Sequence, residues 1–161
     1  MIGYGAVFLS AVLIGLAWLH YRIDVYWPAT HVEIGWFRVV GAAVWAFFFL
    51  AYVGSVWVLS RRGGGAYVEF DPPARLVETG PYRWTRNPAA ACVVGMVLGE
   101  AVAFSSTGMF LLFCEACVVA HLQVVLVEEP LLHKRFGRAY LDYCSRVPRW
   151  IPRRPRRPTG R

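Results

Sequence analysis

Charged residues are scarce in this chain of 161 residues, at 17% against 57% for hydrophobic residues. That balance is too apolar for an ordinary soluble domain of this size. Of four apolar runs, the first two hold no charged residue, with His20 counted as neutral, and the other two hold one each, Glu100 and Glu115. We therefore expect an all-α, polytopic membrane protein with four transmembrane helices, the third of them short. The four runs cover residues 2–20, 39–60, 89–104 and 107–127.

The first run could instead be a secretory signal peptide. It lacks a basic n-region, however, and no small-x-small cleavage site precedes residues 20–22. We therefore expect residues 1–60 to form a retained N-terminal helical hairpin.

Cysteine is also sparse, and the four positions exclude a disulfide framework. Three of them fall within expected spans, and Cys144 lies in a segment expected to face the cytoplasm, where thiols stay reduced. Cys114 and Cys117 have CxxC spacing, but they lie in mid-helix without a second pair. Small buried apolar side chains are therefore favoured over a metal site.

Acidic residues are few, ten against seventeen lysines and arginines, and the formal net charge is +7. The basic residues gather in two segments, with five in residues 60–88 and ten from Lys134 onward, whereas residues 21–38 hold two. The positive-inside rule then places both basic segments and both termini on the cytoplasmic side. Residues 153–161 are expected to be a disordered basic tail, which either lies near anionic lipid headgroups or acts only as a topology determinant without a specific ligand. The lipid bilayer accounts for this charge, so no nucleic acid is expected as a partner.

The apolar runs also carry packing signals. Small residues recur at every fourth position of the third run, at Ala91, Gly95, Gly99 and Ala103. Such a stripe lets a neighbouring backbone approach closely, here that of the second or the fourth helix.

Pro130 predicts a kink or break at residues 126–130, because proline lacks an amide donor and clashes with the preceding turn. Beyond it, apolar side chains at helical spacing predict one C-terminal amphipathic helix, lying along the membrane surface as an interfacial element. Those side chains are Leu132, Phe136, Tyr140 and Tyr143.

Two polar motifs flank the third and fourth runs. The first reads G-P-Y-x-x-x-R-x-P over residues 80–88, and the second reads E-E-x-x-L-x-x-x-F-G-x-x-Y-x-x-Y-x-x-x-V-P over residues 128–148. A carboxylate can hold an ammonium group, a guanidinium can hold a carboxylate, and an aromatic face attracts a cation. We expect the motifs to converge in one pocket. His121 lies two turns before Glu128, so it either lines that cavity or is a buried, hydrogen-bonded histidine.

Together the motifs resemble those of the integral-membrane methyltransferases, which include isoprenylcysteine carboxyl methyltransferases and phospholipid methyltransferases. The resemblance covers residues 67–152 and implies one methyltransferase-like domain over residues 1–152. It also implies S-adenosylmethionine bound on the cytoplasmic side, and a lipophilic acceptor, such as an isoprenylcysteine-type carboxylate or a lipid, that arrives from the bilayer. The implied catalytic residues are Arg86, which would bind a carboxylate, and Glu129, which would hold the cofactor's ammonium or order the site. The candidate cofactor-binding residues, His121 among them, are Tyr82, Asn87, Pro88, His121, Glu128, Glu129, Tyr140, Tyr143 and Pro148.

An amine or phenol acceptor would also need a proton acceptor, for which a glutamate of the pair or His121 is the candidate. A purely structural role is the alternative for Glu128 and Glu129. They could cap the fourth span and pair with Arg135 or Arg138.

The chain departs from the family pattern at two positions. The family reads R-H-P-x-Y-x-G, whereas residues 86–92 read R-N-P-A-A-A-C. Asn87 can keep one hydrogen bond of the histidine but cannot titrate near neutral pH, and Ala90 lacks the tyrosine's ring and hydroxyl. Two alternatives therefore stay open: a non-catalytic membrane scaffold or lipid-binding protein of the same fold, and a nicotinamide-dependent lipid reductase.

Overall fold

The structure is a computed structural model, and every regular element in the part of the chain that it describes is a helix. This confirms the all-α prediction. Most of the first apolar run, the segment at residues 65–72 and the tail at residues 154–161 lie outside the described residues. The described residues are 15, 18–23, 25–26, 34–64 and 73–153.

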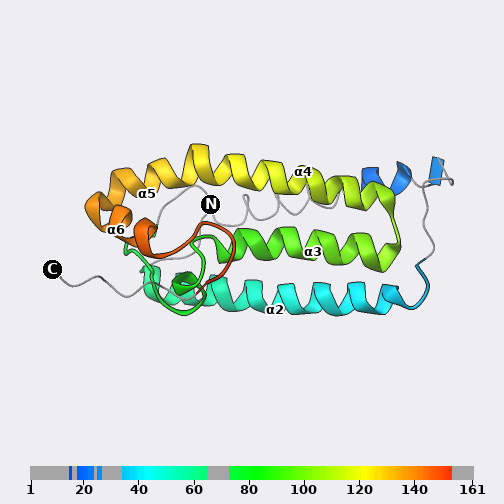
Figure 1. The fold of residues 1–161 in the computed structure, drawn as a ribbon, viewed down its shortest axis with the longest axis horizontal. Helices are drawn as coiled ribbons and strands as arrows, with labels where there is room; N and C mark the ends of the chain where they lie inside the picture. The colour runs from blue at the N-terminus through cyan, green and yellow to red at the C-terminus, as the bar shows by residue number, and fades with distance from the viewer. Residues whose placement is uncertain (1–14, 16–17, 24, 27–33, 65–72, 154–161) are drawn as a thin grey trace. The chain divides into compact units, whose positions relative to one another are not determined.

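Two helical stretches are long and apolar enough to cross a membrane, namely α2 and the continuous stretch at residues 107–136. The helix α3 is apolar but shorter. The elements follow in the order α2 (Phe37–Gly63), the 3-10 turn η2 (Gly80–Arg83), α3 (Pro88–Phe104), α4 (Thr107–Gln123), the π-helical turn η3 (Val124–Glu128), α5 (Glu129–Phe136) and α6 (Arg138–Arg146) (Figure 1).

The chain divides into two compact units, each of which is described by itself. Unit 1 comprises residues 1–50 and 92–120, and unit 2 comprises residues 51–91 and 121–161. The helices α2, α3 and α4 each contribute residues to both units.

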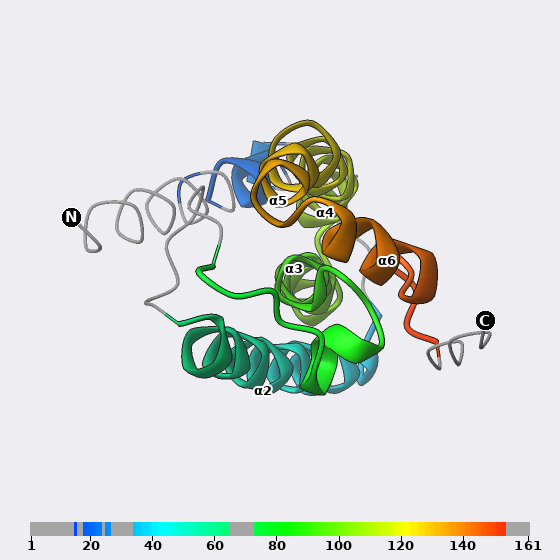
Figure 2. The ribbon, with the colours of Figure 1, turned by 90° about the vertical axis from the view of Figure 1, so that its left-hand side faces the viewer.

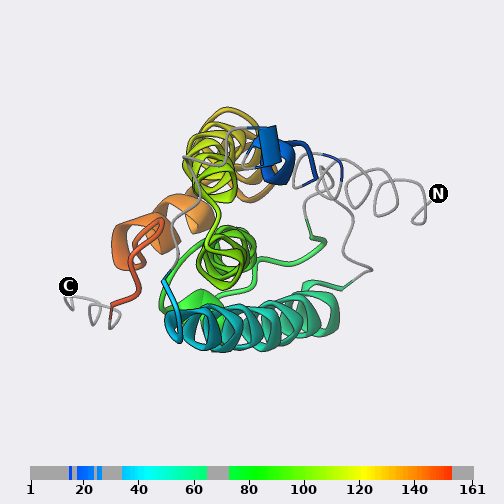
Figure 3. The same cartoon turned by 90° about the vertical axis from the view of Figure 1, so that its right-hand side faces the viewer.

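In unit 1, α3 lies between α2 and α4 (Figures 1 and 3). A Cβ atom added to Gly99 would lie 2.7 Å from the backbone nitrogen of Trp45, and one added to Gly95 would lie 2.5 Å from the ring of Phe48. Both neighbours belong to α2. The small-residue stripe therefore brings α3 into close contact with α2. The sequence predicted a close approach to the second or the fourth helix, and the second is found.

The carboxylates of α3 and α4 in the described part of unit 1 have polar partners. The carboxylate of Glu100 accepts a hydrogen bond of 3.0 Å from Nε1 of Trp45. The ring nitrogen Nε2 of His20 lies 3.3 Å from a carboxylate oxygen of Glu115. Since a polar group without a partner is costly in an apolar surrounding, these pairs make both carboxylates compatible with apolar helices.

The helix that begins at Thr107 is distorted just before Pro130. Over the turn η3 the hydrogen bonding widens, and the N–H of Glu129 donates to the carbonyl of Val124, five residues earlier. The proline has no N–H, and its ring would clash with the carbonyl four residues earlier in a regular helix. The predicted distortion is confirmed, and it takes the form of a π turn.

The prediction of one continuous amphipathic helix after Pro130 is wrong. The helix stops at Gly137, whose backbone angles of φ 53° and ψ −124° are accessible mainly to glycine. The helix α6 then starts in a new direction (Figure 2). The shared apolar face is nevertheless preserved, because the side chains of both helices join one hydrophobic cluster. Its members are Leu76, Leu132, Phe136, Tyr140, Tyr143, Cys144 and Val147.

Candidate functional site

The two motif segments are joined through their backbones within unit 2. The N–H of Arg86 donates to the carbonyl of Pro148 over 2.9 Å, and the N–H of Arg153 donates to the carbonyl of Trp84 over 3.2 Å. The segment after α6 therefore returns alongside the η2 turn (Figure 2). These bonds fix the first motif against the end of the second.

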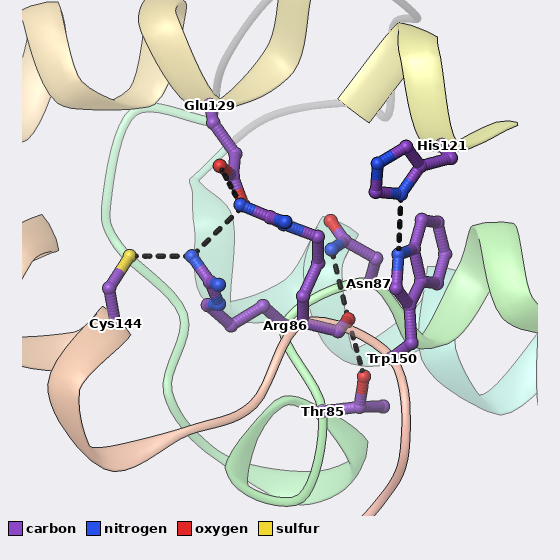
Figure 4. A network of polar contacts seen from close by, with 8 residues as sticks. Thr85, Arg86, Asn87, His121, Glu129, Cys144 and Trp150 are labelled. Atoms are coloured by element: carbon purple, nitrogen blue, oxygen red, sulfur yellow. Dashed lines mark hydrogen bonds and ion pairs between the residues drawn. The ribbon is translucent and has the colours of Figure 1, made fainter. Parts of the chain in front are cut away.

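Side chains of the first motif add two further bonds to the same segment. The hydroxyl of Thr85 and the amide Nδ2 of Asn87 both donate to the carbonyl of Arg149, over 2.9 and 3.1 Å (Figure 4). Asn87 thus keeps a hydrogen bond at the position where the family has histidine. This bond needs an N–H donor and no titrating group.

Glu129 joins the two motifs by ion pairs. One of its oxygens lies 3.0 Å from a terminal nitrogen of Arg86, and the carboxylate also accepts two bonds of 2.8 Å from Nε and Nη2 of Arg149. The Glu129 side chain is 17% exposed and that of Arg86 is 12% exposed, so solvent screens this network weakly. The bonds to Glu129 raise the pKa of Arg149 further above its ordinary value. The predicted convergence of the two motifs is confirmed.

Arg86 also reaches α6. One terminal nitrogen donates to the sulfur of Cys144 over 2.7 Å (Figure 4). Its Nε atom is buried and has no acceptor among the described residues. Arg86 is therefore held from two sides and keeps a buried N–H donor without a partner among the described residues.

The tyrosines of the site are buried. Tyr143 donates its hydroxyl to the carbonyl of Tyr82 over 2.6 Å, and the ring centroids of Tyr140 and Tyr143 lie 6.2 Å apart. Burial raises the pKa of both phenols well above the ordinary value near 10. Both are neutral hydroxyl groups at physiological pH, and Tyr143 orders the η2 turn.

The remaining candidate residues lie around this network. Pro88 is buried as the first residue of α3, and Glu128 accepts a bond of 3.3 Å from Gln123. His121 is exposed, and its Nδ1 accepts a bond of 3.2 Å from Nε1 of Trp150 (Figure 4). It is therefore hydrogen-bonded without being buried.

A hollow of about 250 Å³ opens beside the network. We call it the basic hollow. Its wall consists of residues 144–149 together with Arg86 and Arg153. Four guanidinium groups line it, and no carboxylate does.

Sequence reasoning missed several residues that build the site. Arg149 directly follows the V-P end of the second motif, and this position was the available signal for it. Thr85, Cys144 and Trp150 carried no such signal, because their roles depend on how α6 and the segment after it fold back. The alternative in which Glu129 pairs with Arg135 or Arg138 is wrong, since its partners are Arg86 and Arg149.

The described residues thus form a helical protein with long apolar helices and a polar network that joins two motifs. The family pattern described as phospholipid methyltransferase matches residues 36–139, which is more than half of the chain, and the chain belongs to this family. The family is part of the isoprenylcysteine carboxyl methyltransferase-like superfamily. No curated protein matches the chain significantly. Family and apolar helices together indicate a membrane protein and a methyltransferase that acts on lipid-type substrates.

Proposed function

We propose that this protein transfers a methyl group from S-adenosylmethionine to a lipophilic acceptor, an isoprenylcysteine-type carboxylate or a lipid, at the cytoplasmic face of a membrane. The observation that supports this most is the bridge from Arg86 through Glu129 to Arg149. It joins the two motifs of a methyltransferase family within one unit.

The residues present fit the proposed cofactor. S-adenosylmethionine has a carboxylate, an ammonium group and a sulfonium cation. Arg86 has a buried Nε–H without an acceptor in the described part of the chain, which suits an anionic ligand group. Both carboxylate oxygens of Glu129 already accept bonds from guanidinium groups. We therefore assign Glu129 to ordering the site, and we propose the neighbouring carboxylate of Glu128 for the ammonium group of the cofactor.

Methyl transfer requires that the donor and the acceptor are aligned and that water is excluded. When bound, the cofactor supplies an electrophilic methyl group that the acceptor displaces in line. Glu129 fixes the directions of Arg86 and Arg149, and the buried tyrosines exclude water from beneath them. A carboxylate acceptor then needs no base. For an amine acceptor His121 is not suited to proton removal, because the bond from Trp150 uses the only lone pair of the neutral imidazole.

The membrane arrangement is part of the same proposal. We propose one domain over residues 1–152, four membrane spans, and α5 and α6 at the interface. The basic segments and both termini would face the cytoplasm. The mainly apolar, exposed surface of α2 supports contact with lipid.

The direct test exposes membranes with and without the protein to methyl-labelled S-adenosylmethionine and identifies the labelled product. We expect Glu129→Gln and Arg86→Ala each to abolish labelling while both variants insert normally into membranes. Lys134→Gln is the matched control, because Lys134 is exposed on α5. Full labelling by both site variants would disprove the site assignment. Absence of any product from the wild-type protein, together with absence of cofactor binding, would disprove the function.

A further inference from the structure

The basic hollow contains a nucleophile that the proposed methyl transfer does not use. Cys144 is half-buried on α6 and lines the hollow, and its sulfur accepts the bond of 2.7 Å from Arg86 (Figure 4). The wall around this thiol is basic, because it includes the side chains of Arg86, Arg146, Arg149 and Arg153.

The hollow has more positive charge than its neighbourhood neutralises. Three of its four guanidinium groups share two carboxylates, those of Glu78 and Glu129, and neither carboxylate lines the hollow. The fourth belongs to Arg153, whose side chain is exposed and has no polar partner among the described residues. A wall of this kind attracts an anionic ligand.

Cys144 differs from the other cysteines in what surrounds its sulfur. Burial and the neighbouring Cys144, with which it shares a side-chain hydrogen bond, raise the pKa of Tyr140. The sulfur therefore has a guanidinium and a phenol beside it. Among the described contacts, no guanidinium lies on the sulfur of Cys92, Cys114 or Cys117.

A thiol in an open, basic hollow matches the chemistry of thiol–disulfide exchange. The exchange needs an accessible sulfur in its thiolate form, and a disulfide that comes close to it. Oxidised glutathione is a disulfide whose halves both end in carboxylates, and guanidinium forks bind carboxylates through two parallel bonds. The volume of about 250 Å³ lies below the range of about 300–1,000 Å³ typical of pockets for a whole small molecule, so it suits one charged end of the tripeptide.

We propose that the basic hollow is a modification site, in which Cys144 forms a mixed disulfide with glutathione. The thiolate of Cys144 attacks one sulfur of oxidised glutathione, and a new S–S bond forms as the old one breaks. The released half leaves as a thiolate and takes up the proton that Cys144 has given up. Cys144 is thereby oxidised and the released half is reduced, and an excess of reduced glutathione reverses the step.

The modification would also act on methyl transfer, and this consequence alone rests on the proposed function. Carboxylates of the bound tripeptide would compete with Glu129 for Arg149. The bond from Arg86 to the thiol sulfur would be disturbed at the same time. Methyl transfer would therefore slow when the cytoplasmic glutathione pool becomes oxidised, and it would recover on reduction.

The test treats the reduced, purified full-length protein in a neutral detergent with oxidised glutathione or with the uncharged hydroxyethyl disulfide. Peptide mass spectrometry then measures the rate of modification at each cysteine. We expect Arg153→Gln to slow modification of Cys144 by oxidised glutathione about threefold to fivefold, the effect of one exposed cation. The rate with the uncharged disulfide should change by less than about twofold, because that reagent gains nothing from the cation.

Arg138→Gln is the matched control, because Arg138 is exposed on α6 and does not line the hollow. It removes the same charge and should leave both rates unchanged. Arg153→Lys should keep most of the wild-type rate, since lysine keeps the charge. High salt should reduce the advantage of oxidised glutathione over the uncharged disulfide.

Methyl transfer is measured on the same samples. We expect it to fall in proportion to the modified fraction of Cys144 and to return after treatment with a dithiol. A Cys144 that oxidised glutathione does not modify would overturn the inference. Equal slowing by Arg138→Gln and Arg153→Gln would overturn it too, because net charge rather than the hollow would then set the rate. A protein without methyl transfer would refute the proposed function and leave the mass-spectrometric result unaffected, so the two proposals fail separately.

Discussion

At the scale of single residues, Glu129 determines how the site is held. It is a largely buried carboxylate with two guanidinium partners from segments far apart in the sequence. Removing one partner of a buried ion pair commonly costs about 3–5 kcal/mol, because the remaining charge stays desolvated. The network is thus a positioning device first, and its failure would disorder both motifs together.

The hydroxyl of Tyr143 gives a second prediction at this scale. In Tyr143→Phe the bond to the Tyr82 carbonyl is lost, and we expect the free energy of unfolding to fall by about 1 kcal/mol. Because the folded pKa of Tyr143 is raised, its contribution to stability is complete below the unfolded pKa near 10 and is lost as the pH rises above it. The variant should therefore lose stability less steeply above about pH 10. Chemical unfolding in detergent across this range checks it, and an unchanged pH slope would contradict it.

The sequence predicted some of these residues and not others. The two motifs predicted that Arg86 and Glu129 would lie close together, because both were expected to bind one ligand of mixed charge. It could not predict that Glu129 would be shared with Arg149, since that depends on the segment after α6 folding back to bond with Thr85 and Asn87. Long-range backbone pairing of this kind leaves no periodic signal in a sequence.

At the scale of helices, the contact between α3 and α2 depends on glycine. We expect Gly99→Ala to lower the free energy of unfolding by about 1–3 kcal/mol, because the added methyl group would meet the Trp45 backbone at 2.7–2.9 Å. Gly54→Ala in α2 is the control, since its methyl group would meet nothing within 4 Å. It should be neutral or stabilising by up to about 1 kcal/mol through helix propensity. Thermal unfolding in detergent measures both, and equal values would refute the packing argument.

The sequence predicted some interruptions of the helices and missed others, and each outcome has a physical reason. The stripe of small residues in α3 and the distortion at Pro130 follow from local sterics, and both are found. The break at Gly137 was missed because the apolar spacing of Phe136, Tyr140 and Tyr143 continues across it. A spacing pattern reports which side chains share a core, and those side chains do share one. It does not report whether one helix or two present them.

At the scale of the whole molecule, the distribution of arginine and lysine predicts the orientation in the membrane. In a variant without native cysteines, we expect Arg83→Cys and Arg138→Cys to react with a membrane-impermeant thiol reagent from the cytoplasmic side. Trp36→Cys should react from the opposite side. All three positions are exposed, so access within the protein does not limit the reaction. Labelling of Arg83→Cys and Arg138→Cys from different sides would reject the proposed arrangement.

Composition predicted the helices of the described residues but not how they are oriented in a membrane. Apolar run length predicted helices at residues 39–60, 89–104 and 107–127, and helices cover all three. Length and composition by themselves qualify two stretches as membrane spans, and α3 falls short because residues 105–106 form a turn immediately after it. The orientation of a span depends on the bilayer and the insertion machinery, so it stays a prediction.

The π turn at residues 124–128 has a consequence for how this protein tolerates change. A π turn takes about one more residue than an α-helical turn to complete the same rotation, so it accommodates an extra residue without turning the helix that follows. Deleting one residue there would leave Glu129 facing its arginines, but the rewound helix would meet the clash between Pro130 and the preceding turn. Deleting one residue from the regular part of α4 would instead rotate everything after it by about 100° around the helix axis. The extra residue thus lets the helix pass the proline while the carboxylate keeps its direction.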